Sequence, residues 1–338
     1  MQRIVRYVIV LATLVLLVSG AALAQSYTAK ALVSDVTGKA PHIDPLLGNP
    51  WGLAYQPGEP FWISDEATGW STLYDGAGNP QSLQVIVPAA SGTGAGTPTG
   101  IVYNGSTEFK IDSWTSVFLF ATLDGTIQGW SAFDPSTSLI GAKQAGAVYT
   151  GLAISSHTTG NLLFAADVAN NKVDVYNGTF SLVNSFTDPK IPAGYAPFGI
   201  QDINGQVYVA YASQTGGSNG AIDIFTESGT LVKRLATGAP LNQAWGLTVA
   251  PSNFGPLSGT LLVSNNTATG TINGFSLTTG KLVGTISNSA GKPIAINGLW
   301  GIEFGGGTKN NGATNALYFT TGPNHGAQGY FGVINVSN

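Results

Sequence analysis

The chain has 338 residues, of which 43% are hydrophobic and 9% are charged, with 46 Gly, 17 Pro and no Cys. The apolar content excludes a disordered protein, and the net charge of −4 at pH 7 argues against the clustered basic surface that nucleic-acid binding requires. Many turn-forming residues and few strong helix formers favour an all-β protein.

Residues 1–24 have the pattern of a secretory signal peptide. Arg3 and Arg6 supply the positive start, Tyr7–Val18 is an apolar run, and Ala22–Ala24 is a small-residue cleavage site. The alternative is an uncleaved membrane anchor, because the stretch up to Ala24 is just long enough to span a bilayer. Cleavage predicts an exported protein, periplasmic or extracellular, with no stable membrane insertion. Removing two of the 13 basic residues and none of the 17 acidic ones leaves a net charge of −6.

A three-residue motif recurs six times along the rest of the chain. It consists of an aromatic residue or Thr, then Gly, then Leu or Ile, and its copies are Trp51-Gly52-Leu53, Thr99-Gly100-Ile101, Thr150-Gly151-Leu152, Phe198-Gly199-Ile200, Trp245-Gly246-Leu247 and Trp300-Gly301-Ile302. Periods of about 40–50 residues are typical of propeller blades rather than of helical repeats.

Each motif begins a short apolar strand, and further strand-like segments rich in Val, Phe, Tyr and Leu follow it. Second strands are expected at Phe61–Ser64, Val117–Thr122, Leu162–Ala166, Val207–Tyr211, Leu261–Ser264 and Leu317–Thr320. Third strands are expected at Ser71–Tyr74, Thr126–Trp130, Lys172–Tyr176, Ala221–Phe225, Thr271–Phe275 and Gly329–Ile334. Fourth strands are expected at Gln84–Val87, Gly146–Tyr149, Leu182–Phe186, Leu231–Leu235 and Lys281–Ile286.

The sixth repeat has no fourth strand of its own, and the segment Lys30–Ser34 reads as a spare strand before the first motif. Pairing the spare strand with the last repeat would close a ring and remove its free edges. The sequence therefore predicts an all-β fold. It is a six-bladed β-propeller of four-stranded antiparallel blades, in which the N-terminal strand closes the last blade. We expect residues 25–338 to form this one domain, as a monomer.

The repeated glycine and its aromatic neighbour have a structural interpretation. Inner strands converge near the axis of a propeller, where a Cβ atom would crowd the next blade. The Trp or Phe is expected to fill the wedge between blades further from the axis. The alternative, in which the Trp residues form a ring that stacks on a ligand, is less favoured because four aromatic copies occupy equivalent positions.

Longer motifs add a family resemblance. They are Asn49–Ala54, Phe61–Asp65, Ser71–Gly76, Pro98–Asn104, Phe120–Trp130, Val148–Ala153, Gly194–Gln201, Ala244–Leu247, Gly298–Ile302 and Leu317–Pro323. Together they resemble an uncharacterised family of secreted bacterial propellers related to NHL-repeat proteins. The resemblance implies a six-bladed propeller and export, and it implies no established activity.

Polar side chains follow the second strands, in loops that share one face of a propeller with the loops joining successive blades. The candidates are Asp65, Asp167, Asn265, Asn324 and His325. Carboxylate and amide oxygens suit Ca²⁺, a polyol or a sugar, so this channel mouth is a candidate ligand or metal site. The alternative is turn chemistry, because Asp and Asn cap tight turns through their own backbone. No metal or other cofactor is firmly predicted, although Ca²⁺ fits the residue types.

Two classes of function follow. The first is a binding scaffold for a small molecule, a glycan or a protein. The second is a metal-assisted hydrolase or lyase, similar to a lactonase, with Asp65, Asp167 and Asn265 around the ion. Cleavage would leave one Arg, Arg234, so a carboxylate-gripping Arg cluster is excluded. The three His residues lack metal-ligand spacing, and His157 is expected on the face opposite the candidate site.

Overall fold

The computed structural model describes residues 25–337. The predicted signal peptide, residues 1–24, lies outside this described part. No helix among the described residues is long and apolar enough to cross a membrane.

The described residues form six blade sheets, which we number in chain order and which are antiparallel except where the short β2 pairs parallel to β1. Blade 1 contains β3 (Pro50–Tyr55), β4 (Phe61–Asp65), β5 (Trp70–Tyr74) and β6 (Val85–Ile86). Blade 2 contains β7 (Pro98–Tyr103), β10 (Phe118–Thr122), β11 (Thr126–Trp130) and β12 (Leu139–Lys143). Blade 3 contains β13 (Tyr149–Ile154), β14 (Leu162–Asp167), β15 (Lys172–Asn177) and β16 (Leu182–Phe186).

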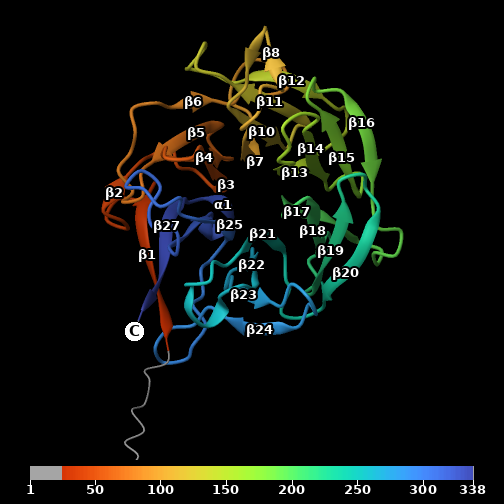
Figure 1. Cartoon of the computed structure of the whole chain (residues 1–338). Coiled ribbons are helices and arrows are strands. Elements are labelled where there is room, and N and C mark those ends of the chain that lie inside the picture. Colours follow the sequence, from red (N-terminus) through yellow and green to blue (C-terminus); the bar gives the residue numbers. More distant parts are fainter. Residues whose placement is uncertain (1–24, 338) are drawn as a thin grey trace, which may run out of the picture.

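The second half of the ring repeats this order. Blade 4 contains β17 (Tyr195–Asp202), β18 (Gln206–Ser213), β19 (Gly220–Thr226) and β20 (Leu231–Thr237). Blade 5 contains β21 (Ala244–Val249), β22 (Leu261–Asn265), β23 (Ile272–Phe275) and β24 (Leu282–Thr285). Blade 6 contains β25 (Leu299–Phe304), β26 (Leu317–Thr321), β27 (Tyr330–Ser337), β1 (Ser26–Ser34) and the short β2 (His42–Ile43). Figure 1 shows the blades around the axis, with each first strand nearest the centre.

The ring closes through the N-terminal strand, as predicted. In blade 6 the strand order is β2-β1-β27-β26-β25, so β1 takes the place of the missing fourth strand. It runs antiparallel to β27, with Ser26 opposite Ser337 and Ser34 opposite Tyr330. The predicted six-bladed, all-β propeller is therefore confirmed, and the strand Lys30–Ser34 is the second half of β1.

One predicted strand was misplaced. Gly146–Tyr149 was expected to be the fourth strand of blade 2, but that strand is β12, and Tyr149 is the first residue of β13. Four of the five residues of β12 are partly exposed and the fifth is fully exposed. Its side chains therefore lack the alternation of buried and exposed positions by which a strand is recognised from sequence. Blade 2 also carries an added hairpin of β8 (Lys110–Ile111) and β9 (Trp114–Thr115).

The hydrophobic core is divided among the interfaces between neighbouring blades. Six clusters of buried apolar side chains fill these interfaces, and Phe164 and Tyr211, for example, lie in the cluster between blades 3 and 4. Hydroxyl groups add hydrogen bonds across four of the interfaces near the axis, one of them from Thr320 Oγ1 of blade 6 to the Trp51 carbonyl of blade 1. Thr99 Oγ1 donates to the Tyr149 carbonyl at 2.7 Å, Thr150 Oγ1 donates to the Phe198 carbonyl at 2.8 Å, and Ser264 Oγ donates to the Trp300 carbonyl at 2.6 Å.

The motif glycines allow this close approach, and their tolerance of a side chain differs between blades. A Cβ atom at Gly199 would overlap the carbonyl oxygen of Trp245 in the next blade, whereas one at Gly151 would stand 3.2 Å from the Phe198 carbonyl. We expect Gly199→Ala to lower the free energy of unfolding by about 1–3 kcal/mol, as overpacking does, and Gly151→Ala to lower it by less. Urea denaturation of both variants checks this, and equal losses would contradict the interpretation.

Candidate functional site

Three tryptophans from the repeated motif meet at the axis. Trp51 and Trp300 stack with ring centroids 3.6 Å apart, and Trp245 meets them edge-on at 6.1 and 5.8 Å. Trp245 also donates from Nε1 across the axis to the carbonyl of Thr150 in blade 3, at 2.9 Å. The expectation that these side chains lie between blades, further from the axis, is therefore wrong. They form one buried cluster, completed by Phe198 and Leu123, which we call the tryptophan plug.

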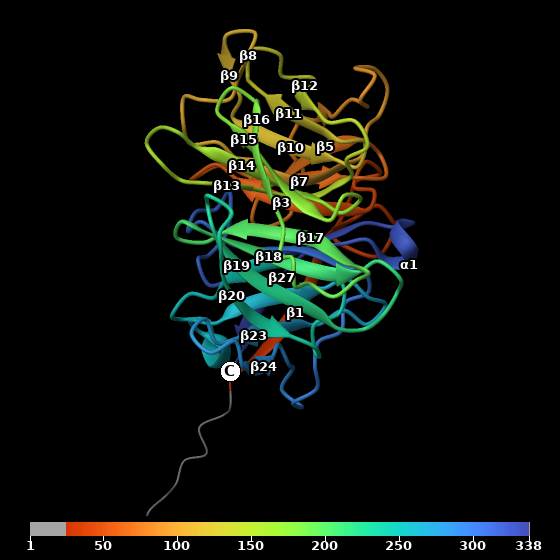
Figure 2. The same cartoon turned by 90° about the vertical axis from the view of Figure 1, so that its right-hand side faces the viewer.

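A wide cavity of about 970 Å³ opens above the tryptophan plug, on the face that carries the short helix α1 (Pro323–Gly326) (Figure 2). Trp51 and Trp300 lie at its floor. Its wall comes from the loops between second and third strands and from the loops between blades, as the topology predicts. The polar residues of the wall belong to blades 1, 4, 5 and 6 and are Asn49, Glu66, Ser213, Asn242, Gln243, Asn266, Thr267, Asn297, Asn324 and His325.

The chemistry of this wall is dominated by side-chain amides. Among the described residues that line the cavity, Glu66 is the one carboxylate, His325 is the one imidazole, and there is no Lys or Arg. An amide offers both donors and an acceptor, so the wall suits a neutral ligand that carries hydroxyl groups. A phosphate or another strongly anionic ligand would lack a counter-charge here.

Several of the wall residues have a left-handed backbone. The φ angles are 43° at Asn49, 51° at Gln243, 55° at Asn324 and 60° at His325. Such angles are uncommon outside glycine and cluster at functional sites, where the surrounding structure holds them. At Asn324 and His325, the backbone is held because Gly322 and Gly326 pack directly against the side chain of Asn49, which leaves no room for a Cβ atom at either glycine.

A hydrogen-bonded chain links the floor of the cavity to its rim. Trp300 donates from Nε1 to Asn49 Oδ1 at 3.1 Å, and Asn49 donates from Nδ2 to Glu66 Oε2 at 2.7 Å. The Asn49 amide is thus fixed in one orientation, with its oxygen toward the plug and its nitrogen toward the carboxylate. This arrangement keeps Glu66 at the mouth of the cavity as a positioned acceptor.

Two buried donors at the cavity have no hydrogen-bond partner among the described residues. They are Trp51 Nε1 and Asn266 Nδ2. Trp51 is only 7% exposed, and an unsatisfied buried donor costs about 1–3 kcal/mol. Buried N–H groups without partners are rare in proteins, and both of these residues line the cavity.

Of the five predicted site residues, Asn324 and His325 line the cavity. Asp65, Asp167 and Asn265 do not, and each stands at the end of a second strand with its side chain turned into its own blade. Asp167 accepts from the Val148 and Asn170 amides at 3.1 and 3.3 Å, and Asn265 accepts from the Asn242 amide at 3.1 Å. The Asn170 contact fits the turn-chemistry alternative at Asp167. Asn265 instead accepts from Asn242 and donates to the Pro240 carbonyl, both in the loop from blade 4 to blade 5.

Asp65 differs because part of its carboxylate is unsatisfied. Its Oδ2 accepts from the Thr72 amide at 3.0 Å and from Thr72 Oγ1 at 2.8 Å, while Oδ1 is buried without a partner among the described residues. Burial raises the pKa of Asp65 well above its ordinary value, against the hydrogen bonds from Thr72, and the nearby carboxylate of Asp44 adds to the rise.

The residues around the axis do not fit the Ca²⁺ site that the sequence suggested. Calcium needs six to eight oxygen ligands converging on one point, whereas Asp65, Asp167 and Asn265 bond within three separate blades. The described part of the chain contains no group of three or more His, Asp or Glu side chains placed to hold a metal ion. We therefore derive no chemical step through a metal.

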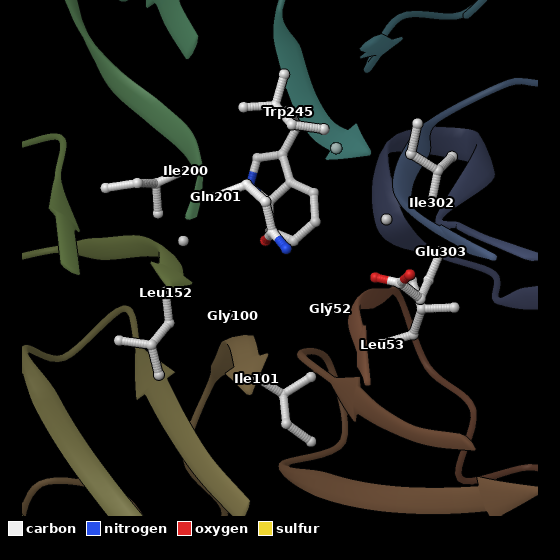
Figure 3. Close-up of a pocket in the computed structure, with 14 residues that line it drawn as sticks. Gly52, Leu53, Gly100, Ile101, Leu152, Ile200, Gln201, Trp245, Ile302 and Glu303 are labelled. Carbon is white, nitrogen blue, oxygen red and sulfur yellow. The ribbon is translucent and has the colours of Figure 1, made fainter. Parts of the chain in front are cut away.

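Sequence reasoning missed Glu303, which lies on β25 inside the narrow channel below the plug (Figure 3). Burial raises its pKa to about 7, against one hydrogen bond from the Phe304 amide at 3.1 Å. Comparison of the six motif copies could have singled out Glu303. The second residue after the motif glycine is Ala54, Val102, Ala153, Gln201, Thr248 and Glu303 in turn, so one blade alone carries an acid there.

His157 lies on the face opposite the cavity, as predicted, in the loop between β13 and β14. Its Nε2 pairs with Glu227 Oε2 at 2.6 Å, and this hydrogen bond raises the pKa of the imidazole. The side chain is 46% exposed. The pair joins blades 3 and 4 at the surface and has no contact with the cavity.

No family model matches the chain. Solved structures of similar fold include streptogramin B lyase, with a TM-score of 0.54 and 14% identity over 92% of this chain and 98% of that chain. They also include a gluconolactonase from Xanthomonas campestris, with a TM-score of 0.56 and 15% identity over 86% of each chain. At this level of identity the likeness shows a shared propeller fold.

Sequence relatives come from Acanthamoeba polyphaga mimivirus. Its uncharacterized protein R648 is 34% identical over 295 residues, covering 80% of this chain and 72% of the relative. Its protein R640 is 32% identical over 264 residues, and there the match spans about half (47%) of the relative's length. The chain belongs to the same family of propeller proteins as the uncharacterized protein R648.

Proposed function

We propose that the protein is a binding propeller whose wide cavity takes a neutral, hydroxyl-rich ligand, either a polyol or a saccharide. The observation that carries this proposal is the wall of the cavity, which has six side-chain amides, one carboxylate and no Lys or Arg among the described residues that line it. Saccharide hydroxyls accept and donate hydrogen bonds in alternation, as carboxamides do. A cavity of about 970 Å³ accommodates a mono- or disaccharide.

The placement of the donors explains how such a ligand would be oriented. Asn49 and Glu66 are held by the hydrogen-bonded chain from Trp300, so the acceptor on the blade 1 side is fixed before the ligand arrives. Asn242, Asn266 and Asn297 approach from blades 5 and 6. A saccharide ring lying on Trp51 and Trp300 would present its hydroxyl groups to the blade 1 side and to the side of blades 5 and 6 at once. Because the wall is ordered before the ligand arrives, less entropy is lost on binding.

A thermal-shift series with neutral monosaccharides, disaccharides and alditols tests the proposal. A ligand at a hundred times its Kd stabilises the native state by about 2.7 kcal/mol, which raises the Tm of a chain of this size by about 5 °C. We expect the double variant Asn266→Ala/Asn297→Ala to weaken binding of the best saccharide at least tenfold in calorimetry. Absence of any stabilising saccharide or alditol would overturn the proposal.

Asn335→Ala is the matched control, because Asn335 is exposed on β27, away from the cavity. It should bind like the wild type. The second predicted class, a metal-assisted hydrolase or lyase, makes a different prediction: CaCl₂ in the same series would raise the Tm, and lactones would be consumed. If Asn335→Ala lost as much saccharide affinity as the double variant of the cavity, the loss would not be caused by the cavity residues.

Export to the periplasm or the extracellular space belongs to this proposal. The signal-like residues 1–24 support it, and a glycan or polyol ligand is in keeping with an exported binding protein. A bacterial source, a monomeric state and the absence of nucleic-acid partners also remain predictions from sequence. Amino-terminal sequencing of the secreted protein would test cleavage after Ala24.

A further inference from the structure

The far end of the channel holds a second, chemically different space. Below the tryptophan plug, a ring of Leu and Ile side chains lines a narrow channel, which continues into a cavity of about 280 Å³ at the opposite mouth. Residues common to the channel and this lower cavity are Leu53, Ile101, Gln201 and Glu303. Figure 3 shows Gln201 and Glu303 pointing toward the middle of the channel from blades 4 and 6.

Glu303 is a carboxylate in mainly apolar surroundings. Among the described residues that line the channel and the lower cavity, it is the one acidic side chain, and no Lys, Arg or His accompanies it. Its only hydrogen bond among the described residues comes from the Phe304 amide. Glu303 is half-buried, and a carboxylate in apolar surroundings without a positive partner is costly to ionise. A cationic ligand would therefore supply the positive charge that the lining residues lack.

Aromatic side chains complete the lower cavity. Tyr55 and Tyr103 line it beside Glu303, with Ile154 and Pro57 as apolar walls. Burial raises the pKa of Tyr55 to about 12, and the charge of Glu303, which lines the same cavity, adds to the rise. Aromatic rings next to an acid are the surroundings in which proteins bind organic ammonium ions by cation–π and charge attraction.

We propose that this lower cavity, formed by Glu303, Tyr55, Tyr103 and Gln201, binds a small organic ammonium ion. An alkylammonium ion is preferred to a metal ion, because one carboxylate among apolar walls cannot replace the six or more oxygens that Ca²⁺ or Mg²⁺ requires. The apolar walls cover the alkyl groups, and the Gln201 amide oxygen is a further acceptor. The site stands apart from the saccharide cavity, with the tryptophan plug between them.

The side chains packed around Glu303 come from β3, β7, β17, β21 and β26. Tyr55 on β3 and Tyr103 on β7 are phenols. The lining residues from β17 and β21, Gln201 and Trp245, do not titrate. Tyr318, the register partner of Glu303 on β26, donates its hydroxyl to the Gly76 carbonyl at 2.8 Å. Asp202 follows Gln201 on β17, and burial raises its pKa to about 6. The pH dependence of binding is therefore assigned to Glu303 only if it disappears in Glu303→Gln.

The test compares choline with its neutral isostere, 3,3-dimethylbutan-1-ol, by calorimetry at constant ionic strength. We expect choline to bind at least tenfold more tightly at pH 8.5. Because the pKa of Glu303 is about 7 and choline is permanently charged, its apparent affinity should rise about thirtyfold between pH 5.5 and 8.5 as the carboxylate ionises. Equal binding of the two probes by the wild type, or affinity independent of pH, would overturn the proposal.

Variants localise the site. Glu303→Gln keeps the shape of the side chain and should lower choline affinity at least tenfold while abolishing the pH dependence. Glu59→Gln is the matched control, because Glu59 is exposed in the β3–β4 loop on the same face. It should leave the choline affinity and its pH dependence unchanged. If Glu303→Gln does not fold, the comparison of probes and the pH series on the wild type still decide the matter. Saccharide binding should be unaffected by Glu303→Gln, so failure of one proposal is distinguishable from failure of the other.

Discussion

Deletion of Ser26–Ser34 is expected to abolish cooperative folding. This strand supplies the outer position of blade 6 and buries Tyr27, Leu32 and Val33. Full burial of each such side chain contributes about 1.5–3 kcal/mol, and the strand also satisfies the backbone of β27. The free energy of unfolding of a folded protein is about 5–15 kcal/mol. The stability lost with the strand is therefore as large as the total stability of the domain. Near-ultraviolet circular dichroism and thermal melting of the deletion variant measure it.

The closing strand also connects blade 6 to blade 5. Tyr27 donates its hydroxyl to the Phe254 carbonyl at 2.8 Å and accepts from the Leu257 amide at 3.2 Å. A synthetic peptide of residues 25–36, added in trans, should therefore restore the melting transition of the deletion variant. A scrambled peptide of the same composition is the control. A deletion variant that melts like the full chain would contradict the role of β1 as the closing strand.

Loss of Arg234 is the second change with a large expected effect. Its guanidinium binds Asp188 of the blade 3 to blade 4 loop, and its Nε donates to Asp223 Oδ1 on β19 at 2.9 Å. Both carboxylates are buried, so Arg234→Met would leave two buried charges unpaired. Breaking a buried pair in this way costs about 3–5 kcal/mol, which urea denaturation at pH 8 would measure.

The loss of stability caused by Arg234→Met should depend on pH. Burial raises the pKa of Asp223 to about 6, against the hydrogen bond and charge of Arg234, which lower it. Without Arg234 the pKa rises further, so the folded variant takes up a proton more readily than the unfolded chain. The destabilisation is therefore largest at pH 8 and smaller at pH 5. Lys281→Met, which removes an exposed cation, is the control, and a loss independent of pH would contradict this account.

The architecture of the ring could be predicted from sequence because it rests on repeated, local signals. The motif glycines mark the inner strands, and close approach between blades explains them, as Gly199 against Trp245 shows. Blade 6 lacks a fourth strand of its own, and Lys30–Ser34 is a spare strand. Together these two features predict that the N-terminal strand closes the ring by pairing with blade 6. These features depend on periodicity and on the requirement that strand edges be paired.

The content of the channel could not be predicted in the same way. A motif shows that Trp51, Trp245 and Trp300 are equivalent, but not whether an indole turns toward the axis or toward the next blade, which depends on strand tilt. Asp65 and Asp167 follow apolar strands whether they bind a ligand or cap a turn. Glu303 lies near the end of β25, an inner strand, and not in the loops after the second strands where the sequence places its candidate site.

The tryptophan plug has a consequence for exchange with solvent. Since Trp51, Trp245 and Trp300 pack against one another across the axis, the described part of the chain forms no continuous pore through the ring. Solutes reach each mouth from its own side, so the saccharide and the ammonium ion proposed above would bind and dissociate independently. We expect their two binding free energies to be additive unless Trp245 changes rotamer.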